Sequence, residues 1–177
     1  MSENPTVYHC RMRFLPILLF LLFPVLAHAF DGLVVSVTDG DTLIVTDAAR
    51  QRHTIRLSGI DAPNKYQAFG QKSHASLSAI TFNRNVEVIG TQRDRQGRLL
   101  ARVMVADPNC NMPECLKIHD AGLVQIMSGM AWHHQQYVNE LTLQERETYA
   151  AAEFNAKIRR LGLWSDVNPV PPWLWRR

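Results

Sequence analysis

Leu33-Val-Val-Ser-Val-Thr-Asp-Gly-Asp-Thr-Leu-Ile-Val45 contains two apolar runs on either side of a short acidic turn. Leu33, Val35 and Val37 alternate with other residues, which is the period of a β-strand with one buried face. An Asp-Gly pair between two such runs is a strong hairpin signal. The segment therefore predicts two antiparallel strands with two carboxylates at the turn that joins them.

Three more β-runs follow, separated by polar turns. They cover residues 53–57, 86–89 and 99–105. In the first of them Ile55 and Leu57 face the same way, so Arg56 points to the opposite face. Five short strands of this kind, with a helical segment inserted before the last two, fit a small closed barrel.

Helical periodicity occupies three segments, which begin near residues 67, 120 and 142. The third opens with Thr142-Leu-Gln-Glu145, a capping-box pattern, and its periodicity is expected to turn Phe154 and Ile158 toward the core. Together the strands and helices predict an α+β fold, a five-stranded barrel of OB type with three helices.

The N-terminal region is typical of a secretory signal peptide. Arg11 and Arg13 precede an apolar run at residues 14–26, which is shorter than the roughly 20 residues of a membrane-spanning helix. Ala27-His-Ala29 follows as a cleavage site, and Met12 is an alternative start. An uncleaved membrane anchor is the competing interpretation.

We therefore expect three parts: a signal peptide, one OB-fold domain and a Pro/Trp-rich tail too rich in proline for a helix, at residues 1–29, 30–165 and 166–177. Export predicts a periplasmic or secreted protein without stable membrane association after cleavage, and we expect a monomer. Cleavage removes two of the 19 basic and one of the 16 acidic residues, so the formal charge changes from +3 to +2. A charge this small permits nucleic-acid binding without arguing for it.

Cleavage would also remove Cys10 and leave Cys110 and Cys115 as an even pair. An even pair in an exported protein predicts a disulfide. A cysteine-based metal site that includes His119 is the alternative, but too few soft ligands lie nearby in the sequence.

Carboxylates and arginines at the ends of the expected strands are the candidate functional residues. Asp41 and Asp61 can converge if the strands fold back on one another, as they do in a small barrel. Oxygen-only ligands favour calcium or magnesium over zinc, and an incomplete protein shell leaves positions for water and a phosphate oxygen. Arg56 and Arg98 supply permanently charged forks suited to a phosphate and to the extra charge of its transition state.

Four sequence blocks resemble the signature of the staphylococcal (micrococcal) nuclease family. They are Val37-Thr-Asp-Gly-Asp-Thr42, Ile55-Arg-Leu57, Gly59-Ile-Asp-Ala-Pro63 and Arg93-Asp-Arg-Gln-Gly-Arg98. The resemblance implies an OB barrel with three helices and a calcium-dependent phosphodiesterase that acts on DNA and RNA. It extends to plasmid-encoded bacterial homologues, some of them associated with plasmid maintenance.

The resemblance also implies roles for individual residues. Asp41 and Asp61 match the calcium-binding carboxylates, and Ala62 matches the residue that contributes a backbone carbonyl. Arg56 and Arg98 match the two catalytic arginines. In the family, a glutamate aligns the water that attacks phosphorus while these arginines stabilise the transition state.

Two acids and two departures complete the expected site. Asp39 and Asp94 match supporting acids, although turn capping is an equally good interpretation of both. Asn64 occupies the place of the family's general-base glutamate, and an amide can orient a water but cannot take its proton. Gln96 stands where the family often has an aromatic residue beside the nucleotide, which weakens stacking.

Some other residues have competing interpretations. His133 and His134 are candidate replacement bases, but surface or helix-capping roles are more typical of histidines at a helix end. Trp132, Tyr137 and the tail's tryptophans can stack on bases, yet such rings in a small domain are more often packing anchors.

The sequence thus favours an exported, calcium-dependent nuclease that hydrolyses phosphodiester bonds of DNA, and of RNA as a second substrate. Single-stranded or flexible substrate is expected to be preferred. The alternative is a catalytically weakened OB module that binds nucleic acid, which Asn64 motivates. A structural envelope protein that reuses the fold is the third hypothesis.

Overall fold

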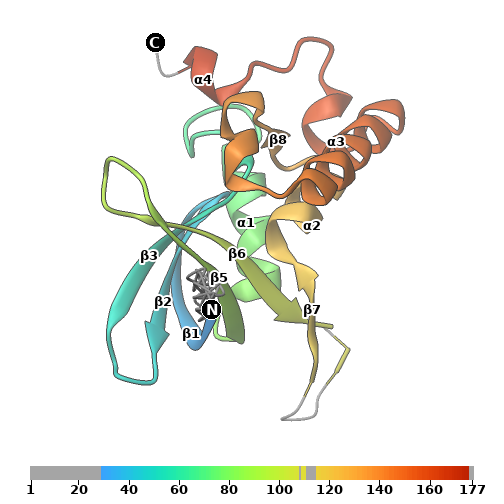
Figure 1. Ribbon diagram of the computed structural model, residues 1–177. Coiled ribbons are helices and arrows are strands. Elements are labelled where there is room, and N and C mark those ends of the chain that lie inside the picture. Colours follow the sequence, from blue (N-terminus) through green and yellow to red (C-terminus); the bar gives the residue numbers. More distant parts are fainter. Residues whose placement is uncertain (1–28, 108, 111–114, 176–177) are drawn as a thin grey trace, which may run out of the picture.

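The computed structural model describes residues 29–107, 109–110 and 115–175 (Figure 1). The expected signal peptide therefore lies outside the described residues, apart from Ala29. The last two residues of the tail also lie outside them.

Five strands form a closed barrel, as predicted (Figure 1). They are β1 (Ala29–Asp39), β2 (Thr42–Asp47), β3 (Arg52–Leu57), β5 (Asn85–Arg93) and β6 (Leu99–Ala106). The pairs β1–β2, β2–β3, β1–β5 and β5–β6 are antiparallel, and a parallel β3–β6 pairing closes the ring. Closure leaves no free sheet edge within the ring.

Alternating burial along β6 helps to fill the barrel. On β6, Leu99, Ala101, Val103 and Val105 are buried, and the residues between them are partly exposed. Inward-facing valines, leucines and isoleucines from the other four strands complete the core. Because successive side chains of a strand point to opposite faces, a strand with alternating apolar residues buries one face in the barrel and exposes the other. On β1 the expected face is wrong, because Leu33 is 38% exposed and the neighbouring Val34 is fully buried.

Two small pairings tie the C-terminal half to the barrel. β7 (Lys117–Asp120) extends the sheet beyond β6, and β4 (Ile60–Asp61) pairs with β8 (Trp132–His133). The second pairing places Asp61 directly opposite Trp132. The end of the barrel that carries the candidate residues is thus built from distant parts of the chain.

The three expected helices are present as α1 (Gly70–Thr81), α2 (Ala121–Met127) and α3 (Leu143–Ile158). The described part of the chain also contains the 3₁₀ helices η1 (Gln135–Glu140) and η2 (Gly162–Ser165). The capping box at Thr142 and Glu145 is confirmed. None of the helices described here is long and apolar enough to cross a bilayer.

Two expectations about the C-terminal region are wrong. Phe154 and Ile158 are 62% and 65% exposed, whereas Tyr149 and Ala156 form the buried face of α3. α3 packs against α2, so the face of α3 that carries Tyr149 and Ala156 is the one that is buried. The tail forms a short helix, α4 (Pro172–Trp175), because a proline at the first helical position leaves no bond unmade.

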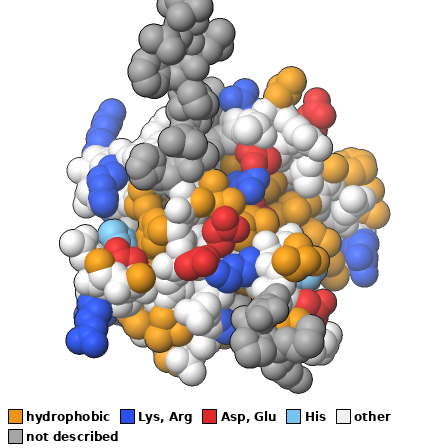
Figure 2. Space-filling view, turned by 60° about the horizontal axis from the view of Figure 1, so that its bottom comes forward, with side chains coloured by type: hydrophobic (Ala, Val, Ile, Leu, Met, Phe, Trp, Pro, Cys, Tyr) orange, Lys and Arg blue, Asp and Glu red, His pale blue; other side chains and the backbone are white. Residues whose placement is uncertain are grey.

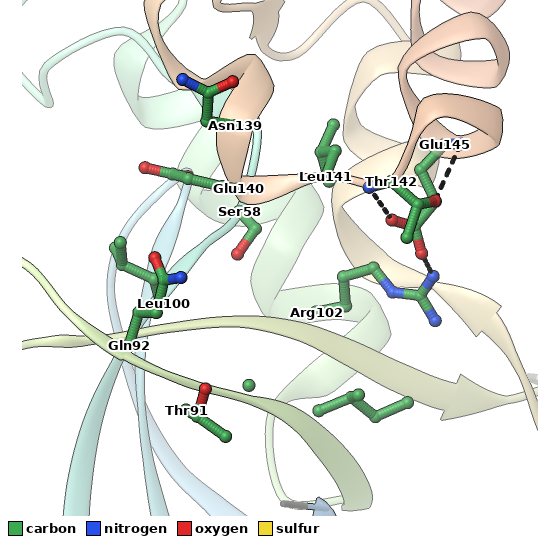
Figure 3. Close-up of a pocket in the computed structure, with 12 residues that line it drawn as sticks. Ser58, Thr91, Gln92, Leu100, Arg102, Asn139, Glu140, Leu141, Thr142 and Glu145 are labelled. Atoms are coloured by element: carbon green, nitrogen blue, oxygen red, sulfur yellow. Dashed lines mark hydrogen bonds and ion pairs between the residues drawn. The ribbon is translucent and has the colours of Figure 1, made fainter. Parts of the chain in front are cut away.

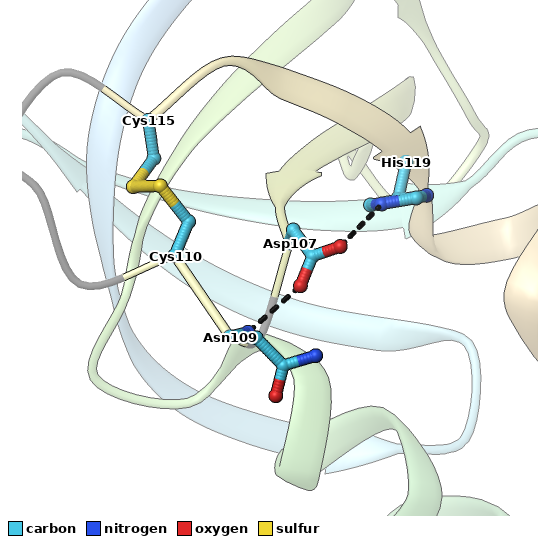
Figure 4. Close-up of a disulfide and its surroundings, with 5 residues drawn as sticks. All are labelled: Asp107, Asn109, Cys110, Cys115 and His119. Carbon is cyan, nitrogen blue, oxygen red and sulfur yellow. Dashed lines mark hydrogen bonds and ion pairs between the residues drawn. A yellow bond between two sulfur atoms is a disulfide. The ribbon is translucent and has the colours of Figure 1, made fainter.

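The expected bond between Cys110 and Cys115 is present in the connection from β6 to β7 (Figure 4). Beside it, one oxygen of Asp107 accepts a hydrogen bond of 2.8 Å from the Asn109 amide. The other oxygen lies 3.8 Å from His119 Nε2. The bond thus links two described parts of this connection covalently.

Candidate active site

The turn between β1 and β2 is locked against two helices. A Cβ atom on Gly40 would lie 1.8 Å from Ser73 Oγ on α1, so only glycine fits. From α2, the buried Gln125 donates a hydrogen bond of 2.8 Å to the Gly40 carbonyl. Gly40 is therefore required for close approach rather than for a left-handed backbone. Its neighbours Asp39 and Asp41 are fixed in place as a result.

Asp41 and Asp61 converge as expected. Asp41 Oδ2 accepts a hydrogen bond of 3.0 Å from the Ala62 amide, which directly follows Asp61. Asp41 Oδ1 accepts one of 2.7 Å from the Thr42 hydroxyl. Asp41 and Asp61 are only 6% and 2% exposed. Two carboxylates twenty residues apart in the sequence therefore lie beside one backbone segment at the end of the barrel.

These groups fit a hard divalent cation. The two groups that donate hydrogen bonds to Asp41 are neutral, and Asp41 makes no ion pair within the described residues. Burying a carboxylate without a compensating charge is costly. Oxygen donors from Asp41, Asp61 and the Ala62 carbonyl suit calcium or magnesium. Across the described chain, no three His, Cys, Asp or Glu side chains group to hold a metal. The protein shell would be incomplete, leaving positions for water or phosphate.

Asp94 lies between the two arginines. Its Oδ2 accepts a hydrogen bond of 2.7 Å from Arg98 Nε and lies 3.9 Å from Arg56 Nε. Its Oδ1 caps the turn through the amides of Gln96 and Arg98, at 2.9 and 3.0 Å. Both interpretations of Asp94, support and turn capping, thus hold together.

Asp94 is held in its charged form. Burial raises the pKa of Asp94, but hydrogen bonds from the Arg98 side chain and from the turn amides outweigh it. The net pKa of this carboxyl lies below its ordinary value. Asp94 can therefore anchor Arg98 across the neutral pH range.

Arg56 is enclosed by residues from several elements. Its Nη1 lies 3.4 Å from the Ile60 carbonyl, and its Nη2 forms an ion pair with Glu140 at the end of η1. The ring of Tyr137, also on η1, covers the guanidinium with its centroid 4.2 Å from Cζ. Tyr137, considered above as a base-stacking residue, contacts the arginine here.

Sequence reasoning missed Glu140. It lies 84 positions from Arg56, in a short 3₁₀ helix that carries no motif. Nothing in the local sequence distinguishes it from the acids that lie on the surface. Only the packing of η1 on the barrel end brings it to the site.

Asn64 lies in the loop between β4 and α1 and is partly buried. Its side-chain oxygen accepts a hydrogen bond of 3.2 Å from the Tyr66 amide, and its carbonyl accepts one of 2.8 Å from the Gln67 amide. The Gln67 side chain in turn reaches the Val170 carbonyl in the tail. The amide of Asn64 therefore shapes a turn that the C-terminal tail contacts.

The two candidate histidines are buried rather than on the surface. His134 is the N-cap of η1, because its Nδ1 accepts a hydrogen bond of 3.1 Å from the Gln136 amide. Neither ring nitrogen of His133 has a hydrogen-bond partner among the described residues. Burial lowers the pKa of His133, partly opposed by Glu153, so the ring is neutral at neutral pH.

Trp132 is a packing anchor. Its ring meets Trp164 and Trp173 edge-on, with centroids 5.5 and 6.3 Å apart. Trp173 also contacts His134, which stacks on Tyr137 at 4.2 Å. Gln96 is exposed and Trp175 is half-exposed. The aromatic residues thus connect the tail to the arginine site.

Charges of both signs are mixed on the surface. On the face drawn in Figure 2, acidic and basic side chains lie next to one another near the centre, with apolar side chains around them. This arrangement agrees with the small formal net charge of +3. Attraction for a polyanion would therefore depend on local groups such as the two arginines.

Comparison with known proteins gives a consistent result. A family model described as "Staphylococcal nuclease homologue" matches residues 54–166. An endonuclease from Escherichia coli, named as uncharacterized, is 36% identical over 165 residues, which cover 93% of this chain and 97% of the relative.

Two further relatives are similar at the same level. A micrococcal nuclease from Shigella flexneri is 37% identical, with 84% of this chain and 81% of the relative covered. Protein ParB from Escherichia coli is also 37% identical, with 82% and 78% covered.

Proposed function

This chain belongs to the staphylococcal nuclease family, a family of nucleases, and we propose that it is a calcium-dependent phosphodiesterase that cleaves DNA, and RNA as a second substrate. One observation carries the proposal. The buried carboxylates and the arginines share one end of the barrel, because Thr42, next to Asp41, pairs across the β2–β3 ladder with Arg56. A site for a hard cation thus adjoins a site for a phosphate.

Arg56 and Arg98 bind the scissile phosphate and stabilise the negative charge that grows on it. Asp94 holds Arg98 by its Nε, so the two terminal nitrogens can face the substrate. A preoriented guanidinium stabilises the transition state without reorganising at the moment of reaction. Both arginines therefore contribute mainly to the rate of the chemical step.

Asp41, Asp61 and the Ala62 carbonyl would hold the cation. When bound, such an ion polarises a phosphate oxygen and acidifies a coordinated water. The Thr42 hydroxyl and the Ala62 amide keep the Asp41 carboxylate oriented, at 2.7 and 3.0 Å. The protein thus supplies a rigid, oxygen-rich cradle rather than a complete shell.

Asn64 orients the attacking water by hydrogen bonding, and the proton passes to solvent. General-base assistance typically contributes about 10² to 10⁴ in rate, so we expect a slower enzyme than one with a carboxylate at this position. Because the grip is on phosphate, base specificity is low. A single strand can splay its backbone into the site, so it is the preferred substrate.

We also propose export to the periplasm or medium as a monomer, after removal of residues 1–29. The bond between Cys110 and Cys115 supports this, because such bonds persist in oxidising compartments. The alternative function, a weakened nucleic-acid-binding module, is favoured by one observation: the side-chain oxygen of Asn64 is already engaged by the Tyr66 amide.

The test is cleavage of single-stranded and supercoiled DNA by the purified protein, with calcium or with chelator. Arg98→Ala should reduce kcat about 10²-fold or more. Arg159→Ala, at an exposed position on the far end of α3, is the matched control and should leave cleavage unchanged. Full activity in chelator would remove the metal from the proposal.

Asn64→Glu separates the two functions. It should raise kcat by about 10²- to 10⁴-fold, because the carboxylate adds a proton acceptor. Asn64→Gln lengthens the side chain without adding a carboxylate and should give no gain. If the wild type is inert and Asn64→Glu cleaves, the binding module is the better account of the native protein.

A further inference from the structure

Arg56 contacts a carboxylate that the expected site does not contain. Glu140 Oε1 forms an ion pair with Arg56 Nη2, and Glu140 Oε2 accepts a hydrogen bond of 3.0 Å from the Gly59 amide. The Arg56 and Glu140 side chains are only 6% and 12% exposed. Water therefore screens this ion pair much less than one on the surface.

The hydrogen bond from the Gly59 amide connects Glu140 to the turn at Gly59. This turn joins β3, which carries Arg56, to β4, which carries Asp61. Gly59 has a φ of +75°, and a Cβ atom there would lie 2.3 Å from Leu141 Cδ1, next to Glu140 in the sequence. The end of η1 therefore packs closely on this turn. The packing places the backbone of η1, and with it Glu140, next to Arg56.

We propose that Glu140 is the positioning residue for Arg56. It holds the guanidinium in the orientation that meets the phosphate and couples it to the turn that leads to Asp61. The inference rests on the nuclease function proposed above, since the phosphate is the ligand that Arg56 serves.

The pairing leaves Arg56 able to bind substrate. A guanidinium has five N–H donors, and Glu140 engages only Nη2. The contact of Nη1 with the Ile60 carbonyl is long, at 3.4 Å, and Nε lies 3.9 Å from Asp94. Donors therefore remain for a phosphate oxygen while one edge of the fork is anchored.

Glu140 does not replace the missing base at position 64. Both of its oxygens are already engaged, one by the Arg56 guanidinium and the other by the Gly59 amide. Its role is carried through Arg56. Tyr137 acts from the same helix by covering the face of the guanidinium.

Glu140 is also separate from the ion pairs around it. It lies at the edge of a surface pocket of about 390 Å³, which Arg102 and Glu145 also line. Figure 3 shows the Glu140 side chain extending away from the Arg102 and Glu145 pair. A change at Glu140 should therefore leave the cap of α3 intact.

The experiment measures kcat and KM for a single-stranded oligonucleotide. Glu140→Gln should lower kcat at least 10-fold and change KM less than about threefold, because the lost orientation matters most in the transition state. Glu147→Gln, the same change at an exposed position on α3, should alter neither. Thermal unfolding of each variant shows whether the fold is retained.

A double-mutant comparison tests whether the effect passes through Arg56. In an Arg56→Ala background, assayed in single turnover with excess enzyme, adding Glu140→Gln should change the rate less than twofold. An undiminished 10-fold loss there, or an unchanged kcat for Glu140→Gln alone, would overturn the proposal.

A measurement without activity separates this proposal from the nuclease function. In the wild type, NMR should resolve separate Nη signals for Arg56, since the ion pair restricts rotation of the group. In Glu140→Gln these signals should merge. Merged signals in the wild type contradict the positioning role, whereas a wild type that has resolved signals but cleaves nothing contradicts the nuclease function.

Discussion

At the scale of single residues, Asn64 and Gln96 are the two positions expected to reduce the rate of cleavage and the binding of a base. The side-chain oxygen of Asn64 accepts a hydrogen bond from the Tyr66 amide, so Asn64 also stabilises the loop. Gln96 is exposed on the turn that Asp94 caps and offers no ring for a base. Neither residue, compared with the glutamate and the aromatic ring expected at these positions, alters Arg56 or Arg98. Under the proposed function, the two replacements would therefore weaken proton transfer and stacking rather than phosphate binding.

At the same scale, His133 is expected to make the fold sensitive to mild acid. Burial lowers its pKa below the ordinary value of 6.5, so the unfolded state binds the proton more readily than the folded state. The stability associated with a neutral His133 is present above pH 6.5 and is lost as the pH falls below it. The urea midpoint of the wild type should therefore fall between pH 7 and pH 5.

His133→Phe provides the comparison, because phenylalanine keeps a ring against Tyr149 and cannot titrate. Its urea midpoint should change less over the same pH range. Equal pH dependence in both proteins would show that another group is responsible.

At the scale of elements, Asp120 joins three of them. Its Oδ1 caps α2 through the amides of Gly122 and Leu123, at 2.8 and 3.3 Å. Its Oδ2 accepts a hydrogen bond of 2.9 Å from the buried Tyr149 hydroxyl on α3, and Arg102 of β6 lies 3.5 Å away. Asp120 thus fixes the two helices to the barrel and to each other.

Asp120→Ala should lower the free energy of unfolding by about 2–4 kcal/mol, through loss of the cap and an unsatisfied Tyr149 hydroxyl. Asp120→Asn should cost less, because asparagine caps well and burial already disfavours the charge, as the raised pKa of Asp120 indicates. Urea unfolding measures both. The interpretation is wrong if Asn is as damaging as Ala.

At the scale of the whole molecule, the cation should stabilise the fold, because Asp41 and Asp61 are brought together only when the barrel is closed. A ligand that binds only the folded state adds about 2.7 kcal/mol at 100 times Kd. For a domain of this size, that corresponds to a rise in Tm of roughly 5–10 °C.

Calorimetry with and without calcium checks this expectation. Asp41→Asn should abolish the calcium-dependent rise, since one of the two carboxylates is lost. Asp107→Asn, beside the disulfide (Figure 4), should retain it, because the connection between β6 and β7 lies on the opposite side of the barrel from β8 (Figure 1). A rise that persists in Asp41→Asn would place the cation elsewhere.

Much of the barrel follows from local pattern. Alternating apolar residues on β6 match its buried face, and the capping box at Thr142 marks where α3 begins. The inner face of α3 could not be read in the same way. Phe154 and Ile158 look like core residues by hydropathy, but the buried residues of α3, which packs against α2, are Tyr149 and Ala156.

Some contacts of the candidate site can likewise be predicted from the sequence, and others depend on the tertiary structure. Asp94 and Arg98 lie in one turn, so their contact can be predicted from their spacing. Asp41 and Asp61 can be predicted to converge because the strands of a small barrel fold back on one another. Glu140 depends on the packing of a motif-free 3₁₀ helix against the Gly59 turn. Contacts between distant segments follow from the shape of the whole core, since no local period or spacing encodes them.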